Sequence, residues 1–259
     1  MNNTLNHLYD IIEFPNNKIR ANLKKKYFAF YELKQITVNI DDKYDGKEVP
    51  IEFFNYRTTV ATWIREYNYS IFIINIPLFQ MLYIYESLTS GDENKEKLPY
   101  YSFLFNYYCE LLAYYIDWAF KKSINIFNTI FELEVNDNPN CFIQILKEIR
   151  NKSKSNVIIN KLKIELQKIE GNKYYKDIVN IRNLNTHSVR ATQSGFMEIY
   201  DLRTGVTSGI ISKPVKPDEI VTTILGSIKL LGQYSVLIEE IIEEHYDYLY
   251  KEYKKIDRK

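Results

Sequence analysis

Residues 100–120 read YYSFLFNYYCELLAYYIDWAF, an apolar run that carries the ionisable residues Glu110 and Asp117. A second apolar run, residues 69–85, is interrupted in the same way by polar residues and by Pro77. Neither run supplies the ~20 uninterrupted apolar residues that a membrane-spanning helix needs. Both are therefore predicted to be buried helices of a globular protein.

The composition supports this interpretation. The chain has 259 residues, of which 46% are hydrophobic and 26% charged, with a net charge of +1. These values exclude a disordered chain and a globally basic nucleic-acid binder. Eight Gly and seven Pro are about half of average usage. This scarcity favours long helices over a turn-rich β-sandwich or a glycine-fingerprint α/β fold.

Prolines punctuate the chain at the start of long periodic segments, where a proline in the first helical turn is tolerated. Polar stretches separate these segments. The pattern predicts helices over residues 16–40, 50–89, 99–134, 140–150, 157–170, 173–190 and 217–254.

One segment, residues 196–211, is rich in β-formers around Gly205 and is predicted to form a β-hairpin. The fold expected is all-α: an elaborated antiparallel helical bundle with a small hairpin. We expect a single domain over residues 1–259, with residues 1–98 as an N-terminal helical elaboration.

Charge is distributed unevenly along the chain. Residues 18–34 hold six basic residues and one acid, a net charge of +5. Residues 147–190 hold eleven Lys or Arg and four acids, a net charge of +7. Residues 218–247 hold seven acids and one Lys, a net charge of −6. A charge run is usually a solvated face, but the second cluster contains the one motif that suggests chemistry.

That motif is IRNLNTH, residues 181–187. A histidine exchanges a proton near neutral pH, and a guanidinium binds a phosphate through a planar, permanently charged fork. The two groups suffice for cleavage of RNA, because the 2′-hydroxyl already supplies the nucleophile. Arg182 is then the phosphate stabiliser and His187 the acid and base.

An all-helical chain with Arg182, the polar Asn183 directly after it and His187 four residues later resembles the HEPN superfamily (higher eukaryote and prokaryote nucleotide-binding), in a bacterial branch. The resemblance covers the motif helix and its neighbours. It implies a helical bundle that forms a homodimer. It further implies a metal-independent endoribonuclease of toxin–antitoxin, abortive-infection or CRISPR-linked defence, with Asn183 as the orienting neighbour. Other members of the superfamily have lost the motif or act as binding modules.

The helical geometry sets a condition on this site. Five residues at 100° each place Arg182 and His187 about 140° apart around a regular helix. They meet only if the helix ends or loosens near Asn185 and Thr186, or if two copies converge across a two-fold axis. The alternative interpretation makes Arg182 a buried structural residue and His187 a surface histidine.

The basic surroundings of the motif are expected to bind RNA, through Lys152, Lys154 and Arg190. Cys109 and Cys141 lack CxxC spacing and are expected to be buried reduced thiols. A metal site is not expected, because the acidic stretch before His245 lacks the paired Glu-x-x-His motifs of a di-metal bundle. These glutamates indicate an exposed stretch, and His245 is expected to be a structural or surface residue.

Phosphate-loop, dinucleotide and serine-hydrolase motifs are absent from the sequence, so no cofactor is expected. No signal peptide or spanning segment is recognised, so the expected location is the cytoplasm, without a membrane.

The function expected from the sequence is therefore a metal-independent endoribonuclease. Its expected partners are RNA, a second copy of the chain and a separate antitoxin protein. The alternatives are a catalytically inactive helical module that binds RNA or a protein, and a structural homodimer that uses its aromatic-rich helices as the interface.

Overall fold

The computed structural model describes residues 14–38, 51–90, 98–135, 141–152, 157–187, 195–201, 206–212 and 216–256. The all-α class is confirmed. The helices are α2 (Asn17–Lys26), α3 (Ala29–Glu32), α5 (Ile51–Ser90), α6 (Leu98–Phe131), α7 (Cys141–Lys152), α8 (Val157–Gly171), α9 (Lys173–His187) and α10 (Pro217–Ile256). Two strands, β1 (Gly195–Asp201) and β2 (Val206–Ser212), pair antiparallel, with Gly195 opposite Ser212 and Asp201 opposite Val206.

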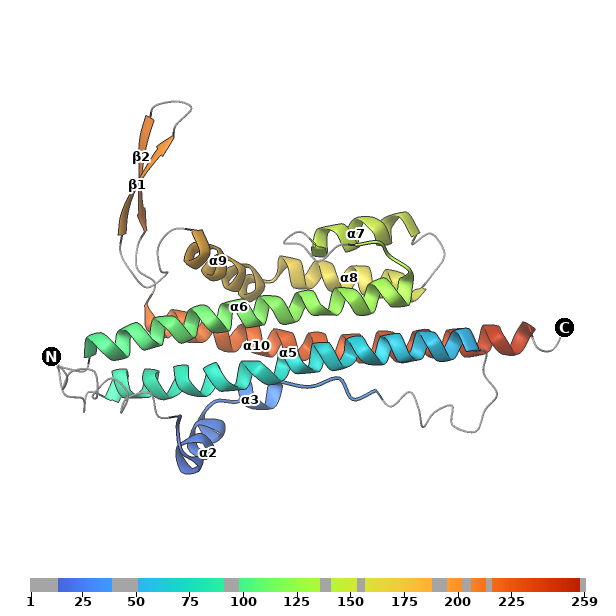
Figure 1. Cartoon of the computed structure of the whole chain (residues 1–259), viewed down its shortest axis with the longest axis horizontal. Helices are drawn as coiled ribbons and strands as arrows, with labels where there is room; N and C mark the ends of the chain where they lie inside the picture. The colour runs from blue at the N-terminus through green and yellow to red at the C-terminus, as the bar shows by residue number, and fades with distance from the viewer. Residues whose placement is uncertain are drawn as a thin grey trace.

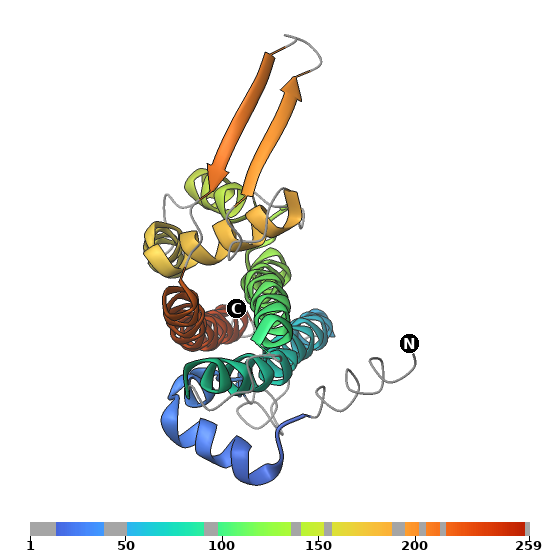
Figure 2. The same ribbon diagram turned by 90° about the vertical axis from the view of Figure 1, so that its left-hand side faces the viewer.

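Three long helices form the core. In Figure 1, α5 runs along the core in one direction, and α6 and α10 run in the other. Helices α5 and α10 have 40 residues each and are therefore about 60 Å long. Figure 2 shows α7, α8 and α9 on one side of these three helices and α2 on the opposite side.

Buried polar contacts fix the register between the core helices. The hydroxyl of Tyr67 in α5 lies 3.0 Å from Ser235 Oγ in α10. Ser123 of α6 hydrogen-bonds to the hydroxyl of Tyr234, the residue beside Ser235. Both tyrosines are almost fully buried. A register shift of one residue would break both contacts and leave polar groups buried without partners, which is costly.

Most helix boundaries lie within three residues of those expected, and Pro77 lies inside α5 without ending it. The exception is the helix expected over 16–40, where α2 ends at Lys26 and α3 at Glu32. Asn68 of α5 explains why the helix does not continue. Its side chain accepts a hydrogen bond from the backbone N–H of Ile36 at 2.7 Å and donates to the Ile36 carbonyl at 2.9 Å.

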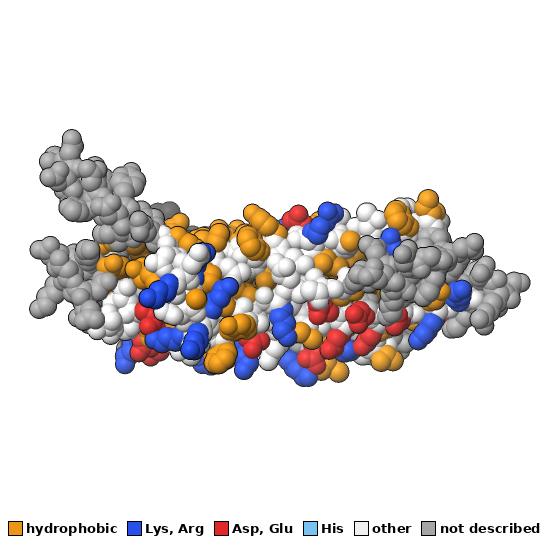
Figure 3. Space-filling model, turned by 90° about the horizontal axis from the view of Figure 1, so that it is seen from below, with side chains coloured by type: hydrophobic (Ala, Val, Ile, Leu, Met, Phe, Trp, Pro, Cys, Tyr) orange, Lys and Arg blue, Asp and Glu red, His pale blue; other side chains and the backbone are white. Residues whose placement is uncertain are grey.

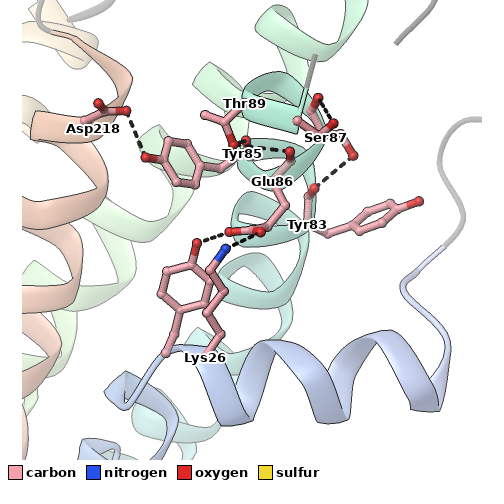
Figure 4. A network of polar contacts seen from close by, with 9 residues as sticks. Lys26, Tyr83, Tyr85, Glu86, Ser87, Thr89 and Asp218 are labelled. Carbon is pink, nitrogen blue, oxygen red and sulfur yellow. Dashed lines mark hydrogen bonds and ion pairs between the residues drawn. The ribbon is translucent and has the colours of Figure 1, made fainter. Parts of the chain in front are cut away.

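Helix α2 is attached to α5 through Glu86. The Lys26 ammonium forms an ion pair with the Glu86 carboxylate at 2.5 Å, and the Tyr27 hydroxyl donates a hydrogen bond to the same group (Figure 4). Burial raises the pKa of Glu86, but the hydrogen bonds from Lys26 and Tyr27 outweigh that effect and the pKa is lowered. A third contact in this region is the hydrogen bond from the Tyr85 hydroxyl to Asp218 of α10, at 2.8 Å.

Two glycines let other elements approach the backbone of α10. A Cβ at Gly226 would lie 2.5 Å from the ring of Tyr174 in α9, and a Cβ at Gly232 would lie 2.1 Å from the carbonyl oxygen of Glu32 in α3. Ser227 also donates a hydrogen bond to the Tyr174 carbonyl at 3.0 Å. Helix α9, which carries the IRNLNTH motif, is positioned by these contacts.

Two helical segments, Phe53–Ser90 and Pro217–Glu252, are long and apolar enough by length and composition to cross a membrane. Their most apolar windows are 50% and 67% buried inside the protein. The core helix of a bundle has the same composition, because its apolar surface packs against neighbouring helices. The length and the apolar content of both segments are therefore also those of helices packed in the core of a protein.

Candidate functional site

The guanidinium of Arg182 lies over a buried carboxylate. Arg182 Nε in α9 is 3.4 Å from Asp117 Oδ2 in α6, and the Asp117 side chain is only 4% exposed. Lys121, one turn further along α6, places its ammonium 2.6 Å from the same oxygen. Two cations therefore converge on one carboxylate, which compensates its burial. The Arg182 side chain keeps 21% of its surface exposed.

The sequence does not predict the ion pair of Arg182 with Asp117. It shows Asp117 only as a charged residue on an apolar helix. The two residues are 65 positions apart, and no local pattern links them. The carboxylate within an apolar helix indicates that a cationic partner exists, because a buried charge needs one, but it does not identify that partner.

The motif helix does not loosen where a single-chain site requires it. Helix α9 continues through Asn185 and Thr186 and ends at His187. Arg182 and His187 therefore remain about 140° apart around the axis, with about 7.5 Å between them along it. Asn183 is exposed beside Arg182. The side chain of His187 lies outside the described residues. Because the helix is continuous, Arg182 and His187 of one copy cannot meet on it. A joint site then requires that two copies of the chain converge.

The residues expected to bind RNA are not brought together in the described part of the chain. Lys152 is the last residue of α7, and its side chain lies outside the described residues. Lys154 and Arg190 lie outside them altogether. Their RNA-binding role stays a prediction.

The basic stretch is partly neutralised. Lys161 bridges Glu240 and Glu244 of α10 at 2.9 and 2.6 Å, and Lys168 and Lys173 pair with acids of their own helices. The acidic stretch of α10 thus lies against part of the basic stretch. The positive charge that residues 147–190 present to a polyanion is therefore smaller than the +7 counted from the sequence.

His245 is buried, whereas the sequence placed it in an exposed stretch. It is 8% exposed and lies among the rings of Tyr56, Phe131 and Tyr248, with centroid distances of 5.8, 5.7 and 6.3 Å. Burial lowers the pKa of His245 to about 4. The imidazole is therefore neutral at pH 7 and does not exchange protons there.

The remaining candidate chemistry is sparse. Within the described ranges, no group of three or more His, Cys, Asp or Glu side chains could hold a metal ion. Cys109 is a buried free thiol, as expected, and burial raises its pKa. Cys141 begins α7, and its side chain lies outside the description.

A cavity of about 560 Å³ lies between the α2–α3 segment and the α9–α10 pair. Lys26, Phe28 and Glu32 line it on one side, and Tyr174 and Lys229 line it on the other.

Comparison with known proteins adds no relative: no protein-family model, no curated protein and no solved structure matches this chain.

Proposed function

We propose that this protein is a metal-independent RNA endonuclease that acts as a homodimer of HEPN type. The observation that carries the proposal is the placement of Arg182. Its guanidinium is held over the buried Asp117, on a continuous helix that also carries Asn183 and His187. The guanidinium is permanently charged, and its planar fork matches the oxygens of a phosphate. An arginine held at this place by Asp117 would therefore stabilise charge on a phosphorane.

In the proposed reaction His187 removes the proton from the 2′-hydroxyl, which attacks the adjacent phosphorus. The 5′-oxygen leaves with a proton returned by a histidine, and one product ends in a 2′,3′-cyclic phosphate. Because Arg182 and His187 lie about 140° apart around α9, the site combines residues of two copies. Defence against phage or a toxin–antitoxin pair, with a separate antitoxin protein, is the biological setting that the resemblance implies.

The surface of the core offers an interface for the second copy. Exposed apolar side chains form one stripe on each of the paired helices α5 and α6. We call them together the α5–α6 stripe: Tyr69, Phe72 and Ile76 on α5, and Phe103, Tyr107 and Tyr114 on α6. Each is about half exposed, so the stripe presents roughly 600 Å². An ordinary interface buries about 800 Å² per partner. Tyr114 is three residues before Asp117 and thus about 60° from it around α6, so this end of the stripe is on the same helix as the carboxylate that holds Arg182.

The test is incubation of purified protein with mixed RNAs in EDTA, with product ends identified by mass spectrometry. We expect cyclic-phosphate ends and a loss of about 10²–10⁴ in rate for His187→Ala, the usual size of a general acid–base contribution. Arg182→Lys should also lose activity, because an ammonium does not reproduce the planar fork. His7→Ala is the matched control and should cleave at the normal rate. Cleavage that stops on chelation, or that survives His187→Ala, rules out this mechanism.

A second function is favoured by a specific observation. The ion pair of Arg182 with a carboxylate that is 4% exposed also suits a purely structural arginine, in a catalytically inactive helical module that binds RNA or a protein. In that case the wild type cleaves no RNA, and Arg182→Lys lowers the unfolding temperature. Under the endonuclease proposal the wild type cleaves RNA and Arg182→Lys loses that activity, so the cleavage assay beside thermal unfolding of this variant separates the two functions.

A further inference from the structure

The α2–α3 segment is the outermost element on one side of the molecule. In Figures 1 and 2, α2 lies below the three core helices. Its inner side is fixed by Leu23 and Ala29, which are buried, and by the contacts of Lys26 and Tyr27 with Glu86. The opposite side of α2 therefore faces solvent.

Positive charge gathers on this outer side. Lys18 and Lys25 are seven residues apart, so they lie in line along α2 and about 140–160° from the buried Leu23. Both are exposed, as is Lys34, and none of the three has an ion-pair partner within the described part of the chain. The one acid between residues 18 and 34 is Glu32, which is half-buried. Figure 3 views this side and shows several Lys and Arg side chains towards the α2 end, with hydrophobic and a few acidic side chains among them.

Two aromatic side chains accompany these lysines. Phe28 is 76% exposed and Tyr31 is 64% exposed. The Tyr31 N–H donates to the Phe28 carbonyl at 2.9 Å, and this turn brings the two residues close together. The two residues follow the end of α2, and most of their surface is in contact with water. Exposed apolar surface flanked by cations is typical of sites that bind a membrane interface.

We propose that the α2–α3 segment docks this protein on an anionic lipid bilayer. Lys18, Lys25 and Lys34 meet the negative headgroups, while Phe28 and Tyr31 insert into the headgroup region. The attachment is peripheral, and the core helices stay packed in the protein. The expectation of no membrane contact rested on spanning segments, which peripheral docking does not need.

The shape of the surface favours a bilayer over RNA. Single-stranded RNA is bound in a basic groove with stacked aromatic side chains. The nearby cavity is lined by Phe28 but also by Glu32, and its Lys26 is already paired with Glu86. Lys18 and Lys25 instead lie on the outer side of α2, where a flat surface can reach them.

The test is flotation of the full-length protein with vesicles of phosphatidylcholine alone or with about 30% phosphatidylserine. We expect binding to the anionic vesicles alone, weakening as NaCl is raised. Phe28→Ala should lower the partition coefficient about tenfold, the loss expected for a partly inserted ring. The double variant Lys18→Glu/Lys25→Glu should lower it at least a hundredfold.

Matched controls change the same residue types elsewhere. Lys251→Glu/Lys254→Glu makes an equal charge change on exposed α10 residues, and Phe54→Ala removes an exposed phenylalanine of α5. Both controls should bind as the wild type does.

Three results overturn the proposal: equal binding to neutral vesicles, unchanged binding by Phe28→Ala, or binding of single-stranded polyuridine but not of vesicles through the same lysines. The RNA-cleavage assay uses no lipid, so each proposal can fail without the other.

Discussion

Replacing His245 with Gln should remove a large pH dependence of stability. His245 is 8% exposed, and its Nδ1 has no hydrogen-bond partner in the described structure. The groups that face it are the rings of Tyr56, Phe131 and Tyr248. The acids just before it on α10 are exposed. Burial lowers the pKa from 6.5 to about 4, so protonation of this imidazole is unfavourable in the folded state.

The sign and size follow from the difference in pKa between the two states. Above pH 6.5 the imidazole is neutral in both the folded and the unfolded chain and contributes no pH dependence. Below pH 6.5 the unfolded chain binds a proton that the folded chain does not, so stability falls until the folded pKa near 4 is reached. A difference of about 2.5 pKa units corresponds to about 3 kcal/mol in total. About 2 kcal/mol of this is lost by pH 5.

The assay is urea denaturation followed by circular dichroism at pH 7.5 and pH 5.0. The wild type should lose about 2 kcal/mol more between these pH values than His245→Gln does. His7→Gln is the control and should keep the wild-type pH dependence. Equal pH dependence in the wild type and His245→Gln refutes the argument, since it means that the imidazole titrates alike in both states.

Four single substitutions, and one double variant, test the packing of the helices by urea denaturation. Gly232→Ala should destabilise the protein by about 1–3 kcal/mol, because its Cβ meets a backbone carbonyl of α3. Gly171→Ala, with nothing within 4 Å of its Cβ, should stabilise it by up to about 1 kcal/mol; equal effects at the two sites contradict the argument. Asp117→Asn should cost about 3–5 kcal/mol by leaving buried positive charge uncompensated, and adding Lys121→Met should recover part of the loss. Ser123→Ala removes the hydrogen bond to its tyrosine partner and should cost about 1 kcal/mol; an unchanged midpoint shows that the bond contributes nothing.

The sequence predicted the long helices because their signals are local. Prolines precede the helices and polar stretches separate them, and α5, α6 and α10 begin and end close to the expected residues. The single helix expected over 16–40 was wrong, because α2 ends at Lys26, α3 covers only Ala29–Glu32, and residues 33–38 are not helical. The backbone N–H groups of residues 36 and 37 donate hydrogen bonds to the side chains of Asn68 and Glu239 instead of to a helix. A local sequence pattern cannot indicate partners that are so distant in the sequence.

The site was predictable only in part, for the same reason. The spacing of Arg182, Asn183 and His187 is visible in the chain, and so is the 140° separation on a helix. The pairing of Arg182 with Asp117 depends on how α9 packs against α6. The burial of His245 likewise depends on aromatic rings from α5 and α6, although the glutamates before it indicated solvent.

The order of the long helices along the chain has a consequence for how the protein acquires its structure. Only residues 91–97 separate α5 from α6, so this helical hairpin closes a short loop and should assemble early. Helix α10 begins only at Pro217, and it contacts Tyr67 of α5 and Ser123 of α6 through hydrogen bonds. During synthesis the hairpin therefore exists before α10 leaves the ribosome, with an apolar face still in water. We expect that interval to be when the protein aggregates most readily and when chaperones engage it.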